Sequence, residues 1–225
     1  MTGRDRIFAK IRAGLGVTGH DQDRQAAAAR RIAASRRHLT PDRVAGKSHE
    51  QHMQLLRGFL EGQCATVVEA ASAKDVPRLV AKYLRDTNLP MRLKVGADGY
   101  LARLPWSTEP ALELRHGRAE AGDEVGLSRA MAAVAETGTL VLASGADNPV
   151  TINFLPETHI VVIEASGVVG TYEDAWARVR ERFGARAMPR TINMISGPSR
   201  TGDIGGKLVM GAHGPRRMCV VIVRA

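Results

Sequence analysis

The sequence predicts an α/β fold, in which helices flank an open, largely parallel sheet and a helical arm precedes this domain. After Gly62, short β-branched runs alternate with helical segments, a pattern typical of parallel sheets built from strand–helix–strand units. The run THIVVIE at Thr158–Glu164 has a continuously apolar centre, as expected for a strand buried on both faces. The first fifty residues contain no comparable run and are rich in Ala and Arg.

The predicted arm covers residues 1–47, and the predicted α/β domain covers residues 48–225. Residues 2–14 fit an amphipathic helix, and residues 22–38 contain many Ala and Arg, which favour helix. The apolar face of the second segment is mostly Ala and therefore buries little surface. We expect the arm to serve contacts between chains, including self-association into a homo-oligomer, more than the α/β core.

Strands and helices then follow in order along the α/β domain. A first helix is expected over residues 48–60, and a capping box that starts at Ser72 predicts the next one. Two further helices are expected at 126–136 and at 171–183, the second with Thr171 as its N-cap. The expected strands are 65–69, 91–95, 112–114, 138–143, 158–164, 191–195 and 218–223.

Composition limits the classes of partner. The chain has 225 residues and a formal charge of +9, and residues 1–50 hold eleven Lys and Arg against five Asp and Glu. Such a basic segment could bind an acidic protein, or it could be a helix whose charges are solvated. It has no nucleic-acid motif, and its one aromatic residue, Phe8, offers no stacking platform for bases. No apolar run approaches the roughly 20 residues of a membrane span, and the start lacks the apolar region of a secretory signal. We expect a cytoplasmic protein that has no membrane span and does not bind nucleic acid.

The cysteines argue against a resident metal or cofactor. The chain has two, Cys64 and Cys219, which are far apart in sequence, whereas an iron–sulfur cluster takes about four thiolates. No HExxH motif, dinucleotide fingerprint or phosphate-binding P-loop is present. Each Cys adjoins an apolar run, so both are expected to be small buried hydrophobic residues.

Two Gly- and Pro-rich segments, SGPSRTGDI at Ser196–Ile204 and GAHGPRR at Gly211–Arg217, predict an anion-binding site. Exposed N–H groups in such turns form concave anion sites, and Arg adds a planar fork that matches carboxylate or phosphate. The first segment follows the 191–195 strand, where an open sheet binds its ligand, and a short helix could start within 202–208. The alternative is a pair of tight turns with solvated charges. The candidate ligand contacts are Ser196, Gly197, Ser199, Arg200, Thr201, Asp203, Gly214 and Arg216.

The segment AETGT adds candidates for catalysis. Glu136 could act as a general base or nucleophile, or it could bond backbone N–H groups at a turn. Thr137, Gly138 and Thr139 would then contact the ligand. His213 lies on the second loop and could transfer protons near neutral pH, or bond a backbone carbonyl as a turn histidine. Asp203 could orient Arg200 rather than meet the ligand.

Four segments together resemble the lactate utilization protein C family, whose shared unit is the LUD domain. They are AETGTLVL at Ala135–Leu142, LPETHIVVI at Leu155–Ile163 and the two loops described above. The resemblance is close over residues 126–223 and looser over 64–123. It implies a fold similar to the sugar-phosphate isomerase and CoA-transferase class, and a role in oxidising L-lactate to pyruvate alongside iron–sulfur partner proteins.

Three functions are consistent with these observations. The first is an accessory subunit of an L-lactate utilization system, with a small-anion pocket and with redox centres on iron–sulfur subunits. The second is an independent transferase-like or isomerase-like enzyme that uses Glu136 and His213. The third is a non-catalytic protein that senses a metabolite.

Overall fold

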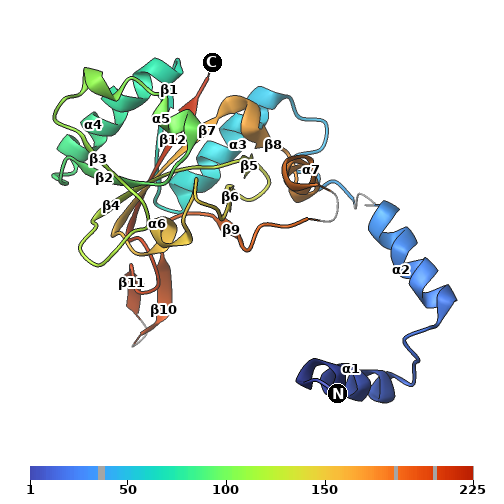
Figure 1. Ribbon diagram of the computed structural model, residues 1–225. Helices are drawn as coiled ribbons and strands as arrows, with labels where there is room; N and C mark the ends of the chain where they lie inside the picture. Colours follow the sequence, from blue (N-terminus) through green and yellow to red (C-terminus); the bar gives the residue numbers. More distant parts are fainter. Residues whose placement is uncertain (35–38, 185–186, 205–206, 225) are drawn as a thin grey trace. The chain divides into compact units, whose positions relative to one another are not determined.

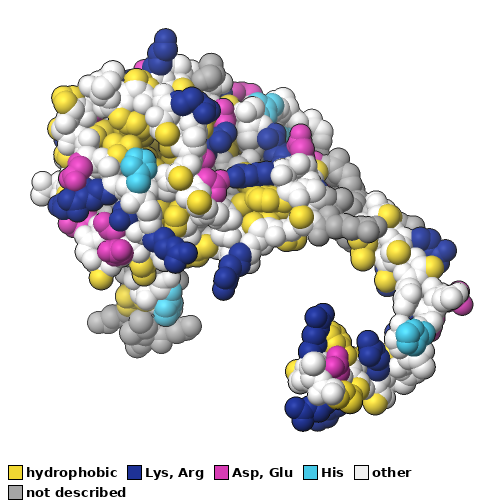
Figure 2. Space-filling view, viewed as in Figure 1, with side chains coloured by type: hydrophobic (Ala, Val, Ile, Leu, Met, Phe, Trp, Pro, Cys, Tyr) yellow, Lys and Arg dark blue, Asp and Glu magenta, His cyan; other side chains and the backbone are white. Residues whose placement is uncertain are grey.

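The computed structural model divides the chain into two compact units, residues 1–39 and residues 40–225. The first unit contains helix α1 (Gly3–Leu15), capped by Thr2, and helix α2 (Gln22–Ala34). Neither helix contains a buried residue, and basic and apolar side chains both lie at the surface of this unit (Figure 2). The structure describes residues 1–34, 39–184, 187–204 and 207–224.

The second unit is built on a six-stranded sheet in the order β1-β12-β7-β4-β2-β3, and every neighbouring pair in it is parallel (Figure 1). This arrangement confirms the predicted α/β fold with a largely parallel sheet. The strands are β1 (Thr66–Ala70), β2 (Arg92–Val95), β3 (Glu113–His116), β4 (Val125–Arg129), β7 (Thr158–Glu164) and β12 (Arg217–Val223).

Two helices cover opposite faces of the central strands (Figure 1). Helix α3 (His49–Gly62) contributes the buried Leu56 and Leu60 to a core with residues of one face of β7 and β12. Helix α4 (Val76–Asp86) packs on the other face through apolar residues that include Val80. The centre of β7 is apolar at every position because both of its faces are covered.

A second sheet of four strands has the order β8-β5-β6-β9. Helix α7 (Tyr172–Phe183), which Thr171 caps as expected, packs on this sheet through Ala175. The strands are β5 (Ala132–Val134), β6 (Thr139–Ala143), β8 (Val168–Val169) and β9 (Ile192–Ile195), and a separate hairpin joins β10 (Arg200–Ile204) to β11 (Lys207–Met210). Two short helices, α5 (Gly99–Ala102) and α6 (Val150–Phe154), lie in the connections.

Two sequence-based expectations about secondary structure are wrong. The segment 126–136, expected to be a helix, contains β4 and β5 instead, because pairing with β7 and β6 overrides the helix propensity of an Ala-rich run. The close packing of β4 also requires glycine at position 126, because a Cβ there would lie 2.5 Å from the Ile152 carbonyl oxygen. No helix starts within 202–204 or 207–208, since these residues belong to the β10–β11 hairpin.

The described helices contain none that is both long and apolar enough to cross a membrane.

Residues 40–47 belong to the second unit, where Val44 is buried in the core beside α3.

Candidate functional site

The motif segments meet in a cluster of four hydroxyl groups. Thr139, which opens β6, is 1% exposed, and its Oγ1 lies 2.7 Å from Thr137 Oγ1, 2.9 Å from the Tyr172 hydroxyl and 2.7 Å from Ser196 Oγ. Strand β6 runs antiparallel to β9, so the start of one lies beside the end of the other. The AETGT segment and the first Gly- and Pro-rich loop are therefore in direct contact.

Two glycines of these segments let the backbone approach the end of α3. Gly138 has a φ of +67°, and a Cβ there would lie 2.5 Å from Phe59 Cβ. Gly197 has a φ of +137°, and its Cβ would lie 2.8 Å from Gln63 Cβ. Because other residues rarely adopt these dihedrals, both positions require glycine for packing, whatever ligand they contact.

The two loops bond to each other through Ser199. The Ser199 N–H donates to the Pro215 carbonyl at 2.8 Å, and Ser199 Oγ accepts from the His213 N–H at 3.1 Å. The Arg200 guanidinium, which is exposed, donates to Gln63 Oε1 and lies 3.9 Å from Cys64 Sγ. Arg200 is thus held against the end of α3.

Glu136 and His213, the two predicted catalytic residues, have separate contacts. Glu136 is half-buried; its N–H donates to the Gly170 carbonyl at 3.1 Å, and its own carbonyl accepts from Arg43 at 3.3 Å. His213 is exposed, and within the described residues no hydrogen bond or ion pair joins its side chain to Glu136. The catalytic pairing of these residues stays a prediction.

The other predicted contacts lie in or near the hairpin. Thr201 pairs with Val209 across the hairpin, and Arg216 forms an ion pair with Glu157 at 3.7 Å. Gly214 lies beside Ser199. Asp203 belongs to β10, but its side chain lies outside the described part of the structure.

The expected position of these loops in the fold is wrong. The first loop follows β9, which pairs antiparallel with β6 in the four-stranded sheet and so is not a strand of the parallel sheet. The second loop directly precedes β12, whose Arg217 is level with Thr158 at the start of β7. The bonded loops therefore lie at the amino ends of the parallel strands, opposite the edge where such sheets usually bind ligands.

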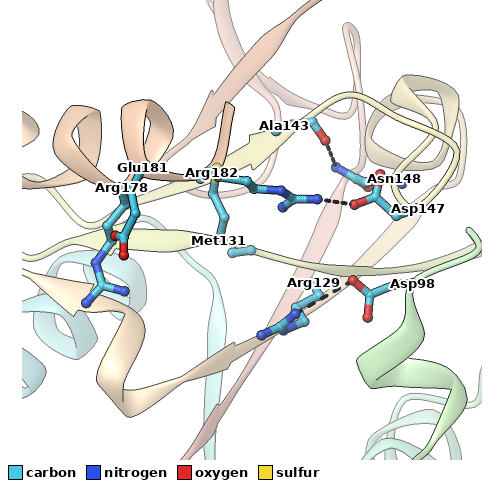
Figure 3. A pocket seen from close by; sticks show the side chains of 10 residues that line it. Asp98, Arg129, Met131, Ala143, Asp147, Asn148, Arg178, Glu181 and Arg182 are labelled. Atoms are coloured by element: carbon cyan, nitrogen blue, oxygen red, sulfur yellow. Dashed lines mark hydrogen bonds and ion pairs between the residues drawn. The ribbon is translucent and has the colours of Figure 1, made fainter. Parts of the chain in front are cut away.

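The carboxyl edge carries a different feature, a cavity of about 410 Å³ (Figure 3). Six charged residues line it: Asp98, Arg129, Asp147, Arg178, Glu181 and Arg182. Arg129 ends β4, Asp98 caps α5 after β2, Asp147 belongs to the loop after β6, and the remaining three lie on α7.

Ion pairs fix two of these arginines. Arg129 bonds Glu164 at the end of β7, lies 3.9 Å from Asp98 and stacks 4.5 Å from the centre of the Tyr100 ring. Burial, and then the charge of Glu164, raises the pKa of the Tyr100 hydroxyl. Arg182 bonds Asp147. Sequence reasoning missed this set because its members are distant in sequence, and because Arg129 lay inside a run expected to be helical.

The two cysteines have different environments. Cys219 is buried in β12, and burial raises the pKa of its thiol to about 12. Cys64 is exposed at the turn between α3 and β1, so its predicted burial is wrong. Among the residues that the structure describes, no three His, Cys, Asp or Glu are grouped to hold a metal ion.

Residues 59–223 match the family model of the LUD domain. The chain belongs to the LUD domain family. The match begins near the end of α3 and includes both the hydroxyl cluster and the cavity at the carboxyl edge. Helices α1 and α2 precede it.

Related proteins match different shares of the chain. A lactate utilization protein C from Geobacillus thermodenitrificans strain NG80-2 is 39% identical over 100 residues, which are 44% of this chain and 42% of that protein. A protein of the same name from Shouchella clausii strain KSM-K16 is 36% identical over 100 residues, 44% of each chain. The chain thus matches less than half the length of either relative.

A solved structure supports the fold of the LUD domain. It is a DUF162 family protein from Deinococcus radiodurans, with a TM-score of 0.56 and 24% sequence identity; the match covers 79% of this chain and 99% of that one. At this identity the likeness concerns the fold alone.

Proposed function

We propose that the chain is an accessory component of an L-lactate utilization system and works with iron–sulfur partner proteins that carry the electrons. The observation that carries the proposal is the LUD match over residues 59–223, together with relatives that are named lactate utilization protein C. The four linked segments that first indicated the family all lie within the matched region.

The cysteine content supports the need for partners. Oxidation of L-lactate to pyruvate releases two electrons and two protons, and these electrons need an acceptor. An iron–sulfur cluster takes about four thiolates, whereas this chain has two cysteines, one exposed and one buried in the sheet. In this proposal, clusters on other subunits accept the electrons.

Growth of the native host tests this role. A strain that lacks the gene should fail to grow on L-lactate as sole carbon source and should grow normally on pyruvate. Tagged protein purified from lactate-grown cells should bring down iron-containing subunits. Unimpaired growth on L-lactate would contradict the proposal, and so would a purified complex without iron.

The proposed small-anion site centres on Arg200, with Ser199 and Ser196, a member of the hydroxyl cluster, shortly before it in the chain. A charge-assisted bidentate contact contributes on the order of 1.5–3 kcal/mol, so Arg200→Ala should weaken binding of a carboxylate about ten- to hundredfold. Arg200→Lys should restore only part of the affinity because ammonium lacks the planar fork. Calorimetric titration with L-lactate and pyruvate measures both effects. Equal affinity of wild type and Arg200→Ala would remove this loop from the site.

A further inference from the structure

The cavity at the carboxyl edge of the sheet, which we call the arginine cavity, is separate from the motif loops. It lies beside the ends of β2 and β4, whereas those loops lie at the amino ends of β7 and β12. Its volume of about 410 Å³ falls within the range of small-molecule sites. In open α/β sheets, ligands bind at this edge.

Two of its arginines are fixed before any ligand arrives. In Figure 3 the Arg182–Asp147 pair and the Arg129–Asp98 pair lie on different sides of the cavity, with Met131 between them. The stacking of Arg129 on Tyr100 and its bond to Glu164 further restrict its guanidinium. A site whose side chains are already ordered loses less entropy when a ligand binds.

Arg178 supplies a cation that is less fully compensated. Its guanidinium donates to the Ser166 carbonyl, and among the described residues no carboxylate lies within ion-pair distance of it. Arg178 and Arg182 are four residues apart on α7 and both line the cavity. In Figure 3 their guanidinium groups point apart, and that of Arg182 reaches Asp147. Arg178 is therefore the cation of this pair that is left for a ligand anion.

The carboxylates define the rest of the ligand. Asp98 and Asp147, which pair with Arg129 and Arg182, line the cavity together with Glu181. An ionised carboxylate accepts but cannot donate. A ligand beside them must therefore offer donors such as hydroxyl groups. Apolar contact is limited to Met131 and two alanines, which does not suit a hydrophobic ligand.

The geometry points to a polyhydroxylated organic anion as the ligand of the arginine cavity. Its carboxylate or phosphate pairs with Arg178, and its hydroxyl groups donate to the carboxylates that line the cavity. This site is additional to the anion site proposed around Arg200, and neither depends on the other.

Calorimetric titration of the full chain with matched probes tests the assignment. Gluconate carries a carboxylate and hydroxyl groups, and hexanoate is its six-carbon counterpart without hydroxyls. Ribose 5-phosphate and inorganic phosphate form the corresponding phosphate pair. We expect gluconate or ribose 5-phosphate to bind at least about tenfold more tightly than its unhydroxylated counterpart, since each lost hydrogen bond to a charged group weakens binding. Tighter binding of gluconate would identify a carboxylate as the anionic group of the ligand, and tighter binding of ribose 5-phosphate would identify a phosphate.

Arg178→Gln should weaken the tighter probe about ten- to hundredfold and leave the thermal unfolding midpoint close to that of wild type. Arg115→Gln removes an exposed arginine that pairs with Glu113 on the edge strand β3 and should leave binding unchanged. The same titrations in the Arg200→Ala background exclude any contribution from the anion site proposed around Arg200, which keeps this test independent of the proposed function. The assignment is overturned if no probe binds, if hexanoate or inorganic phosphate binds as tightly as its hydroxylated partner, or if Arg178→Gln has wild-type affinity.

Discussion

His159 should make the stability of the protein depend strongly on pH. Its side chain on β7 is 0% exposed, and Nε2 lies 3.0 Å from Ser128 Oγ, which in turn donates to Asn153 Oδ1 at 3.0 Å. Since the Ser128 hydroxyl donates its single hydrogen to Asn153, His159 donates from Nε2. Its buried Nδ1 has no hydrogen-bond partner in the described part of the structure. A proton on Nδ1 would therefore place an uncompensated charge in the core.

This burial lowers the pKa of His159 to about 3. The unfolded chain takes up the proton as the pH falls through about 6.5, while the folded protein does not until about pH 3. The unfolded state thus binds more protons between these values, and acid favours unfolding. Linkage gives a loss of about 2 kcal/mol between about pH 7 and about pH 5 from this one side chain.

Urea denaturation of wild type and His159→Gln at these two pH values measures the effect. Glutamine can donate to Ser128 but does not titrate, so the variant should lose about 2 kcal/mol less than wild type over this interval. Carboxylates titrate equally in both proteins and cancel in the comparison. His116→Gln, which removes an exposed histidine, should keep the pH dependence of wild type.

A variant with the same pH dependence as wild type would refute this reasoning. A direct measurement covers the case in which His159→Gln does not fold. In the NMR spectrum of the wild-type protein, the His159 ring should show no titration between about pH 7 and about pH 5. A midpoint near 6.5 would mean that the ring is hydrated in the native state.

Three further predictions follow from local contacts. A thiol reagent should modify Cys64 in the folded protein and spare Cys219, whose thiol is buried. Both cysteines should react in denaturant. Modification of both in native buffer would contradict the burial of Cys219 in β12. Thr139→Val should destabilise the fold by about 1–3 kcal/mol, because it removes the hydroxyl that bonds three others, and urea denaturation measures this. By the same assay, Gly138→Ala should destabilise the protein by about 1–3 kcal/mol, because its new methyl group would lie 2.5 Å from Phe59 Cβ on α3. Gly58→Ala, in open space on α3, should instead stabilise the protein by about 0.5–1 kcal/mol. Equal effects of the two substitutions would contradict the packing at Gly138.

Local patterns in the sequence were sufficient for the fold class and for many of its elements. The apolar centre of THIVVIE predicts a buried strand, which is β7, and Thr171 as an N-cap predicts the start of α7. These signals act within a few residues, through side-chain bonds to nearby N–H groups or through alternation of strand and helix. The four linked segments also indicated the LUD family, which the family match confirms.

Contacts between distant segments decided the rest. The Ala-rich run at 126–136 has helical propensity, but it forms two strands because β7 and β6 lie beside it. The loop at Ser196–Ile204 follows a strand as expected, yet that strand pairs in the smaller sheet, which places the loop at the opposite edge. Local propensity contributes less than about 1 kcal/mol per residue, so burial and pairing override it.

The sequence by itself determined that this chain is an α/β protein of the LUD family, because alternation, capping and the order of the motif segments can all be read along the chain. Only the tertiary structure decided which side chains share a site. Arg129 lies on β4, Asp98 directly before α5 and Arg182 on α7, and no spacing in the sequence relates them. The order of the parallel strands and the position of α7 bring their charges to one cavity, because sheet topology sets distances that the chain alone leaves free.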